Sequence, residues 1–265
     1  MKSVKIVFTD LDCTLTNSEG KIDIKNQKIF ENLANIGIPV VISTGRSIPY
    51  TVPLCKQFST SNYLIASNGA EVFNFLNKNI IYRSVISKEN LDFLDSLIEK
   101  HNLLFFANGI EKRYTNKTDK NIAAIFSNYL KDINEEISQV VIESLDVNVM
   151  IEAKKDLMEN KELKIANKTK NVVEGKMLFY DIVNSDTSKG KAVEILCNYL
   201  KIDPKRAMAI GDSINDIEML DLVGYKAAVE NASDEVKKVA NIITLSNEQN
   251  GVATLLNELY NQKTQ

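Results

Sequence analysis

The chain has little of what many catalytic and structural sites require. Its 265 residues include one histidine, His101, so histidine-centred catalysis is disfavoured. The three cysteines, Cys13, Cys55 and Cys197, are scattered and odd in number, and they form neither a disulfide framework nor a zinc-binding spacing. We therefore expect a reducing, cytoplasmic setting.

Long apolar runs and nucleotide-binding loops are also missing. No run of about 18 apolar residues occurs, so we expect no membrane span, and the first expected strand leaves no room for a signal peptide. The net charge of -3 gives no reason to expect nucleic acid or an anionic membrane as partner. Neither GxxxxGK[ST] nor GxGxxG is present, which disfavours phosphate-loop NTPases and dinucleotide enzymes. The sequence indicates no particular oligomeric state.

What the sequence does contain is a repeated order of buried strand, helix and strand. Short β-branched runs predict the strands, and apolar residues three and four apart predict the helices. This order is typical of an α/β fold with a Rossmann-like parallel-sheet core and right-handed crossovers. The expected strands are 4–10, 38–42, 63–66, 207–210, 227–229 and 242–244, and the expected helices are 24–36, 191–200, 217–223 and 252–259.

A different pattern occupies residues 84–183, and it predicts an inserted α+β cap domain. Residues 1–83 and 184–265 would then form one discontinuous catalytic core. Asn108-Gly109 between two apolar runs is a hairpin signal. The other expected elements are a helix over 91–98 capped by Ser87, a helix through Ile122, Ile125, Phe126 and Tyr129, strands at 140–142, 147–151 and 177–183, and a lysine-rich helix over 154–164.

Polar side chains follow four of the expected strands, at the edge of the sheet where ligands bind in open parallel sheets. A lysine lies where the chain re-enters the core. These residues are Asp10 and Asp12; Thr44; Ser67 and Asn68; Asp212, Asn215 and Asp216; and Lys189.

Carboxylates from separate strands favour a hard, oxygen-liganded cation such as Mg²⁺. A hydroxyl group and a lysine beside them suit phosphate oxygens, so the chemistry indicated is phosphoryl transfer through a carboxylate nucleophile. Two alternatives stay open for individual residues: Lys191 in place of Lys189, and Asp212 as a helix cap.

Four motifs, taken together and in order, resemble those of the haloacid dehalogenase (HAD) superfamily of phosphohydrolases. The chain is most similar to the Cof-type branch, whose large α/β cap is inserted between the second and third motifs. The similarity also includes Ser67-Asn68-Gly69-Ala70 and Asn231-Ala232. The motifs are Asp10-Leu11-Asp12-Cys13-Thr14-Leu15, Ser43-Thr44-Gly45-Arg46, Ser188-Lys189-Gly190 and Gly211-Asp212-Ser213-Ile214-Asn215-Asp216.

The resemblance implies a role for each acid. Asp10 would be the nucleophile that becomes an aspartyl-phosphate, and Asp12 the general acid and base. Mg²⁺ would be held by Asp10, the backbone carbonyl of Asp12 and Asp212, with Asp216 near or behind the metal.

The resemblance also implies a phosphate-binding set. Thr44 and Lys189 would hold the phosphoryl oxygens and belong, with Asp10 and Asp12, to the catalytic residues. Asn215 would orient the phosphate or the lysine. The expected substrate-binding residues are Thr44, Gly45, Arg46, Asn68, Lys189 and Asn215.

Two residues depart from the family pattern. Cys13 stands where the family usually has glycine, and a small buried packing residue is favoured over a redox role there. Glu230, just before Asn231, also replaces a usual glycine.

The leading interpretation is a Mg²⁺-dependent phosphatase of small phosphorylated metabolites, such as sugar phosphates or phosphorylated cofactor precursors. A phosphomutase of the same superfamily is an alternative, and so is a non-catalytic phospho-aspartate or metabolite-binding protein. Asp12 favours an enzyme, because a phosphate store does not need a second acid for leaving-group chemistry. We expect the inserted module to set substrate choice by closing over the site.

Overall fold

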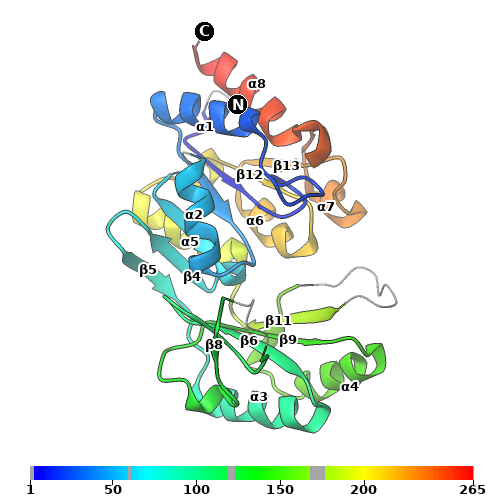
Figure 1. The fold of residues 1–265 in the computed structure, drawn as a ribbon. Helices are drawn as coiled ribbons and strands as arrows, with labels where there is room; N and C mark the ends of the chain where they lie inside the picture. The colour runs from blue at the N-terminus through cyan, green and yellow to red at the C-terminus, as the bar shows by residue number, and fades with distance from the viewer. Residues whose placement is uncertain (1–2, 59–60, 119–122, 168–176, 265) are drawn as a thin grey trace.

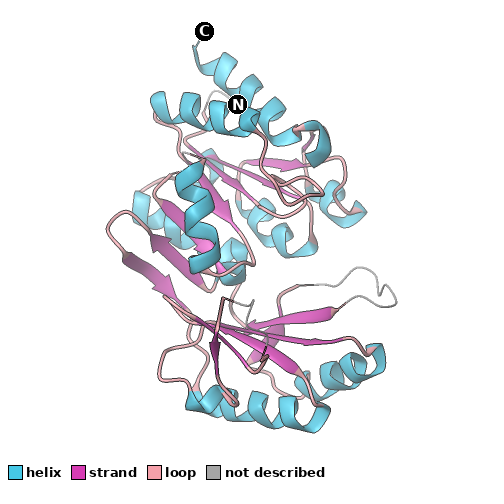
Figure 2. Ribbon diagram, viewed as in Figure 1, coloured by secondary structure: helices cyan, strands magenta, loops and turns pink. Residues whose placement is uncertain are grey.

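The protein consists of two β-sheets, one of eight and one of six strands, with helices packed on both (Figures 1 and 2). The structure is a computed structural model, and it describes residues 3–58, 61–118, 123–167 and 177–264. The first sheet consists, in spatial order, of β14 (Ile242–Ile243), β13 (Tyr225–Ala228), β12 (Ala207–Gly211), β1 (Ile6–Thr9), β2 (Val40–Ser43), β3 (Tyr63–Ala66), β4 (Glu71–Asn74) and β5 (Asn79–Arg83).

The strands from β14 to β3 run parallel, and β4 and β5 add an antiparallel hairpin at one edge. Phe8 of β1 lies in register with Val41 of β2 and Ala209 of β12, and all three are fully buried. Such near-continuous apolar strands are typical of a parallel sheet covered on both faces. The predicted α/β core is confirmed, although the edge hairpin was not predicted.

Helices cover both faces of the parallel sheet. They are α1 (Ile24–Asn35), α2 (Ile48–Gln57), α5 (Lys189–Leu200), α6 (Ile217–Leu222), α7 (Asp234–Val239) and α8 (Gly251–Thr264). Figure 1 shows α1 and α8 on one side of this sheet and α6 on the other. α5 packs against α6. The start of α1 follows from its cap, because the Asp23 carboxylate accepts a hydrogen bond from the Lys25 N–H at 2.7 Å.

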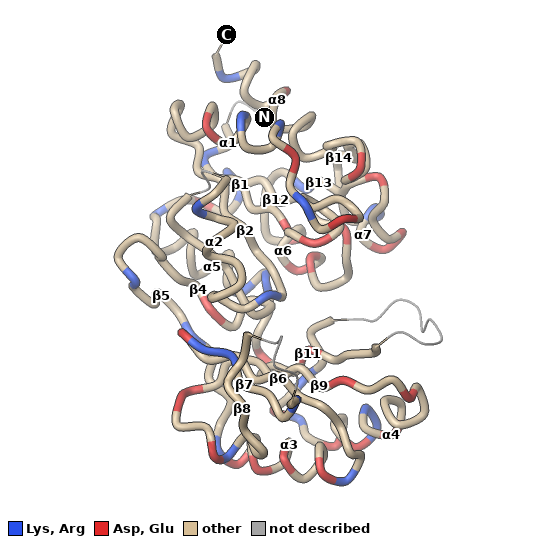
Figure 3. Tube along the Cα trace, viewed as in Figure 1, with Lys and Arg blue, Asp and Glu red and all other residues tan. Residues whose placement is uncertain are grey.

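The second sheet lies opposite one edge of the first (Figure 1). α3 (Lys88–His101) and α4 (Val147–Leu157) cover its outer face. Acidic and basic residues are interspersed along both helices (Figure 3). The strands, in spatial order, are β10 (Leu163–Ile165), β11 (Leu178–Asn184), β9 (Gln139–Ser144), β6 (Leu104–Asn108), β7 (Arg113–Thr115) and β8 (Ile125–Phe126).

Side chains alternate between the two faces of this second sheet. On β6, Phe105 and Ala107 are fully buried in the hydrophobic cluster under α3 and α4. Phe106 and Asn108, between and after them, turn toward a cavity that faces the parallel sheet. The second sheet therefore has an apolar face for the helices and a mixed polar and aromatic face for a site.

Two separate hydrophobic clusters accompany the two sheets. The chain leaves the first cluster after β5 and returns to it after β11, which agrees with a cap inserted into a core. The predicted boundaries at 83/84 and 183/184 stay a prediction. Within the described residues, no helix is both long and apolar enough to cross a membrane.

The helix predicted around residues 122–129 is wrong in its described part. Ile125–Phe126 is β8, which pairs in parallel with β7, and Leu130–Asp132 is a single 3-10 turn. The buried Asp95 carboxylate accepts hydrogen bonds from two backbone N–H groups of that turn, at 2.7 and 3.0 Å. Strand pairing and this contact outweigh the local helical spacing. Ile122 lies outside the described residues.

The strand predicted at 147–151 is wrong, because these residues are helical, and the helix predicted at 154–164 is wrong in its bounds. Both overlap α4, which begins at Val147 because the Asp146 carboxylate accepts hydrogen bonds from the N–H groups of residues 148 and 149, at 2.8 and 3.3 Å. The cap outweighs the β-branched run. The residues that α4 buries are spaced as a helix requires: Met150, Ala153 and Leu157.

Gly69 provides a test of how closely the core packs around the site. It ends the 3-10 turn Ser67–Gly69 with φ of 93°, and a Cβ atom there would clash with the backbone oxygen of Ser188. Gly20 has a similar φ of 72°, but a Cβ atom there would have open space. We expect Gly20→Ala to cost about 1 kcal/mol of unfolding free energy and Gly69→Ala at least about 3 kcal/mol. Urea unfolding followed by circular dichroism measures both, and equal losses would contradict the packing argument.

Candidate active site

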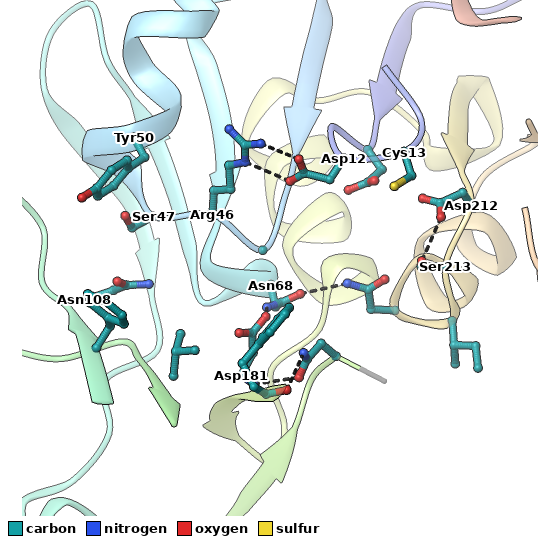
Figure 4. Close-up of a pocket in the computed structure, with 18 of the residues that line it drawn as sticks. Asp12, Cys13, Arg46, Ser47, Tyr50, Asn68, Asn108, Asp181, Asp212 and Ser213 are labelled. Carbon is teal, nitrogen blue, oxygen red and sulfur yellow. Dashed lines mark hydrogen bonds and ion pairs between the residues drawn. The ribbon is translucent and has the colours of Figure 1, made fainter. Parts of the chain in front are cut away.

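The carboxyl ends of neighbouring strands meet at one edge of the parallel sheet. Asp10 follows β1, Thr44 follows β2 and Asp212 follows β12, and these strands are adjacent in the sheet. A cavity of about 890 Å³ lies between this edge and the second sheet. Figure 4 shows side chains from both sheets directed into it.

Three carboxylates gather at the core end of the cavity. Oxygen atoms of Asp10, Asp212 and Asp216 all lie within 4.8 Å of one another, and all three residues are buried. The Lys189 ammonium lies 2.6 Å from an oxygen of Asp10 and 2.7 Å from an oxygen of Asp216. Lys191, the alternative to Lys189 in the sequence analysis, instead forms an ion pair with Asp186 at the surface.

Burial and mutual repulsion shift the protonation of this cluster. Burial raises the pKa of Asp10 well above its ordinary value; Lys189 opposes this shift, while Asp216 and Asp212 add to it. Burial by itself would lower the pKa of the Lys189 ammonium, but the carboxylates of Asp10 and Asp216 outweigh it, so that pKa is raised. Burial and Asp216 likewise raise the pKa of Asp212. Three acids around one ammonium leave uncompensated negative charge, which a divalent cation would balance.

Asp216 is the most engaged of the three acids. One of its oxygens accepts hydrogen bonds from the backbone N–H groups of Asp212 and Ser213, both at 3.0 Å, while the other receives Lys189. Asp216 therefore holds both the lysine and the loop after β12. Asp212 does not cap the next turn; Ser213 does.

Asp212 is oriented by two hydroxyl groups. Thr14 donates a hydrogen bond to one of its oxygens and Ser213 to the other, each at 2.9 Å. These bonds aim the carboxylate at the cavity, which it lines together with Asp10.

Asp12 stands apart from the acid cluster. Its side chain is 49% exposed and forms a bidentate ion pair with Arg46, with distances of 2.9 and 2.5 Å (Figure 4). Both residues line the cavity. The structure thus places one acid beside Lys189 and the second on the open side, held by Arg46.

Thr44 and Gly45 differ in their access to the cavity. Thr44 is fully buried, and its hydroxyl oxygen accepts a hydrogen bond from the Arg46 N–H at 3.1 Å. Gly45 lines the cavity, and a Cβ atom there would lie 3.0 Å from the Asn68 side chain.

Asn68 links the core to the second sheet. Its amide nitrogen donates to the Asp181 carboxylate on β11, and its amide oxygen accepts from Asn215, both at 2.9 Å (Figure 4). The sequence predicted Asn68 and Asn215 as site residues, and the structure brings them together.

Sequence reasoning missed the residues that the second sheet contributes. Their signal was the period-two alternation within the expected strands, in which polar residues interrupt apolar runs. Tyr50 of α2 was missed as well. The cavity residues from the second sheet and the segment beside it are Phe106, Asn108, Arg113, Val141, Glu143, Asn167, Phe179 and Asp181.

Cys13 does not pack in the core. It is exposed, lines the cavity and has a left-handed φ of 60°, so the expectation of a small buried packing residue is wrong. The conformation explains why glycine suits this position. Asn231 donates a hydrogen bond to the Cys13 carbonyl oxygen at 2.7 Å and so joins the loop of Glu230 to this turn.

The chain is similar to known proteins over nearly its whole length. Residues 7–256 match the haloacid dehalogenase-like hydrolases. The chain is 30% identical over 250 residues to a 5-amino-6-(5-phospho-D-ribitylamino)uracil phosphatase of Bacillus subtilis, covering 94% of this chain and 93% of that protein. A second such phosphatase of Bacillus subtilis is 27% identical, with 97% and 98% covered.

Solved structures agree in fold. A haloacid dehalogenase-like hydrolase from Bacteroides thetaiotaomicron superposes with a TM-score of 0.86 at 24% identity, covering 97% of this chain and 99% of that one.

The parallel core, the acid cluster at its strand ends and the inserted sheet over them define a hydrolase with a cap. The chain belongs to the haloacid dehalogenase-like hydrolases. The predicted class, a phosphoric monoester hydrolase of the Cof type, is confirmed by this family and by the relatives.

The Asp181 carboxyl, which joins the second sheet to Asn68 of the core, should make the stability of the protein depend on pH. Burial raises its pKa to about 6, although the hydrogen bond from Asn68 and the charges of Arg113 and Lys189 lower it. In the unfolded chain the pKa is about 3.9. The stability that this group contributes is therefore fully present below about pH 4 and is lost as the pH rises through 6.

Asp181→Asn removes this dependence. The unfolding free energy of the wild type minus that of the variant should fall by on the order of 3 kcal/mol between pH 4 and pH 7. Urea unfolding across that range measures it. Asp186→Asn, at an acid whose side chain is 66% exposed, is the matched control and should give a flat difference. A flat difference for Asp181→Asn as well would refute the assignment.

Proposed function

We propose that this protein is a Mg²⁺-dependent phosphatase that hydrolyses phosphate monoesters of small metabolites through an aspartyl-phosphate on Asp10. The observation that carries the proposal is the buried Asp10 carboxylate, which contacts Lys189 and lines a cavity large enough for a metabolite. A carboxylate held beside a fixed cation is suited to attack a phosphoryl group, because the cation balances the negative charge of the phosphoryl oxygens.

The acid cluster fits a magnesium ion. Its donors are carboxylate oxygens from two strand ends, the ligand type that Mg²⁺ prefers, and one ammonium does not balance three acids. Asp10 and Asp212 would hold the ion, with the Asp12 carbonyl as the expected backbone ligand and Asp216 behind them. When bound, Mg²⁺ would supply positive charge against the transferring phosphoryl group.

The first chemical step uses the two acids of the opening motif. An oxygen of Asp10 forms a bond to phosphorus while the bond from phosphorus to the ester oxygen breaks. Asp12, once protonated and released from its ion pair with Arg46, gives this proton to the departing oxygen. Lys189 would offset the charge on the phosphoryl oxygens, and Thr44, at the neighbouring strand end, is the expected hydroxyl donor to them.

The second step returns the enzyme to its starting state. Asp12 takes a proton from a water molecule whose oxygen attacks phosphorus. The bond from phosphorus to Asp10 breaks, and inorganic phosphate leaves. Asn68 and Asn215 would orient the phosphate, because their amide groups are joined to each other at this end of the cavity. Arg46 holds Asp12 toward the same space.

The substrate class follows from the cavity and the relatives. A volume of about 890 Å³ exceeds what phosphate alone needs and falls within the range of metabolite sites. The named substrate of the Bacillus subtilis relatives is a phosphorylated ribityl compound, which supports a sugar phosphate or a phosphorylated cofactor precursor here. Release of inorganic phosphate separates a phosphatase from a phosphomutase, which would return the group to a second hydroxyl.

The metal assignment predicts the behaviour of Asp212→Asn. Removing one negative ligand should raise the Mg²⁺ concentration needed for half-maximal activity and lower the turnover number together. A Mg²⁺ titration of p-nitrophenyl phosphate hydrolysis measures both quantities. Full wild-type activity in excess EDTA would rule out the metal.

The assignment of Asp12 predicts a difference between leaving groups. Nitrophenolate departs without a proton, so Asp12→Asn should spare the first step on p-nitrophenyl phosphate and slow the second by about 10²- to 10⁴-fold. The phosphoenzyme should then accumulate, giving a burst of nitrophenol near one equivalent and a mass gain of one phosphoryl group on Asp10.

Alkyl phosphates provide the internal comparison for this variant. Their leaving groups need the proton, so the first step itself should slow and no burst should appear. If Asp12→Asn slowed the hydrolysis of alkyl and nitrophenyl esters equally, with no burst and no trapped adduct, the assignment of Asp12 as acid and base would be refuted.

A further inference from the structure

Arg113 is held at the cap side of the cavity by one aromatic ring from the second sheet and one from a helix of the core. Its guanidinium lies 3.8 Å from the ring centre of Phe106 on β6 and 5.4 Å from that of Tyr50 on α2. The Tyr50 hydroxyl also donates to the Ala123 carbonyl oxygen at 3.0 Å, which ties the core helix to the cap. Contacts of a cation with two ring faces fix the guanidinium plane.

The guanidinium is not fully satisfied by the protein. Its Nε atom is buried and has no hydrogen-bond partner in the part of the chain that the structure describes. Burial also lowers the pKa of Arg113, a sign that water does not compensate the charge well. Arg113 as a whole is only half-buried and lines the cavity, so the outer N–H groups of its guanidinium are the ones that can donate to a ligand oxygen there.

The charges around Arg113 decide what kind of oxygen fits. Lys117 forms an ion pair with Glu143, and the Asp181 carboxylate lies within electrostatic range of Arg113. Each of the two cations at this end thus already has an acid near it, so a second phosphate or a carboxylate would gain little net attraction there. A neutral carbonyl oxygen accepts a hydrogen bond from Arg113 and does not depend on that attraction.

The rings indicate the shape of the group that carries this carbonyl. Phe106, Tyr50 and Phe179 all line the cavity, and aromatic side chains favour flat ligands that stack on them or meet their edges. Asp181 is influenced by both Lys189 and Arg113, so it lies between the phosphate end and this one. Arg113 stacks on Phe106 of the second sheet, whereas Lys189 contacts Asp10 at the core end, so the flat group would be at the end of the substrate away from the phosphate.

We propose that Arg113, with Phe106 and Tyr50, forms a subsite for a carbonyl-bearing heteroaromatic ring at the non-phosphorylated end of the substrate. This subsite rests on the proposed function, since it selects among esters whose phosphate reaches Asp10. It makes Arg113 a specificity-determining residue, and it assigns to the cap one defined contact.

Two esters with the same leaving group isolate this contact. 5-Amino-6-(5-phospho-D-ribitylamino)uracil and D-ribitol 5-phosphate share the ribityl phosphate, and only the first carries the ring with its carbonyl groups. The wild type should hydrolyse the ring ester with the higher kcat/KM. Arg113→Met, which keeps the aliphatic stem, should lower kcat/KM for the ring ester by about 10- to 150-fold, the range for losing a hydrogen bond to a charged group.

The same variant should change kcat/KM for D-ribitol 5-phosphate by less than about threefold, because that ester lacks the acceptor. Arg113→Lys, which keeps the charge but not the planar fork, should recover only part of the loss. Lys131→Met is the matched control: it removes a cap cation that also contacts an aromatic ring, 4.8 Å from the centre of Tyr129, but does not line the cavity. It should leave the ratio of the two esters within about threefold of wild type.

Three results would overturn the subsite: equal loss on both esters in Arg113→Met, no loss on either, or no preference of the wild type for the ring ester. Hydrolysis of p-nitrophenyl phosphate, measured alongside, separates this failure from failure of the proposed function. If the wild type and Arg113→Met both hydrolyse p-nitrophenyl phosphate, the variant is folded and only the subsite is at issue. If the wild type hydrolyses none of the three esters, the proposed function fails and the subsite with it.

Discussion

The site depends on one buried contact, the Lys189 ammonium held between Asp10 and Asp216. The lysine is 1% exposed, and both carboxylates lie within 2.7 Å of it. An ammonium at this depth persists because it is paired, and removing one partner of a buried ion pair typically costs about 3–5 kcal/mol. Asp216 also binds the backbone after β12. Asp10, Lys189 and the loop that carries Asp212 therefore form a single cluster that cannot rearrange in parts.

Two residues of that cluster, Asp10 and Asp212, were predictable because each follows a buried run at the end of a strand. Adjacent parallel strands bring their carboxyl ends to one edge, so Asp10 and Asp212 had to approach each other once their strands were recognised. Asp181 gave no comparable signal. It lies inside β11, and its contact with Asn68 depends on how the second sheet is placed over the first. That placement follows from long-range packing, which a local pattern does not contain.

The elements that were predicted wrongly were likewise decided by individual contacts rather than by the sequence pattern. α4 begins where the Asp146 carboxylate satisfies two backbone N–H groups, and this outweighs the β-branched residues after it. The turn after β8 is likewise set by the Asp95 carboxylate from α3. Cys13 was judged by its size and polarity, whereas its left-handed φ of 60° leaves the side chain in the cavity. In each case one contact or one backbone angle decides against a pattern averaged over several residues.

The two ends of the cavity differ in charge, and this difference divides the work between core and cap. The core end has more carboxylates than its ammonium can balance, so it favours a metal ion and the phosphate bound with it. At the cap end Lys117 pairs with Glu143, and Arg113 lies in range of Asp181. The charges at that end are nearly balanced, so a second anion would gain little electrostatic attraction there and a neutral ring would meet little unfavourable charge. Under the proposed function, this charge pattern would orient a phosphate ester with its anion toward Asp10, and the contacts of Arg113 would select the rest of the molecule.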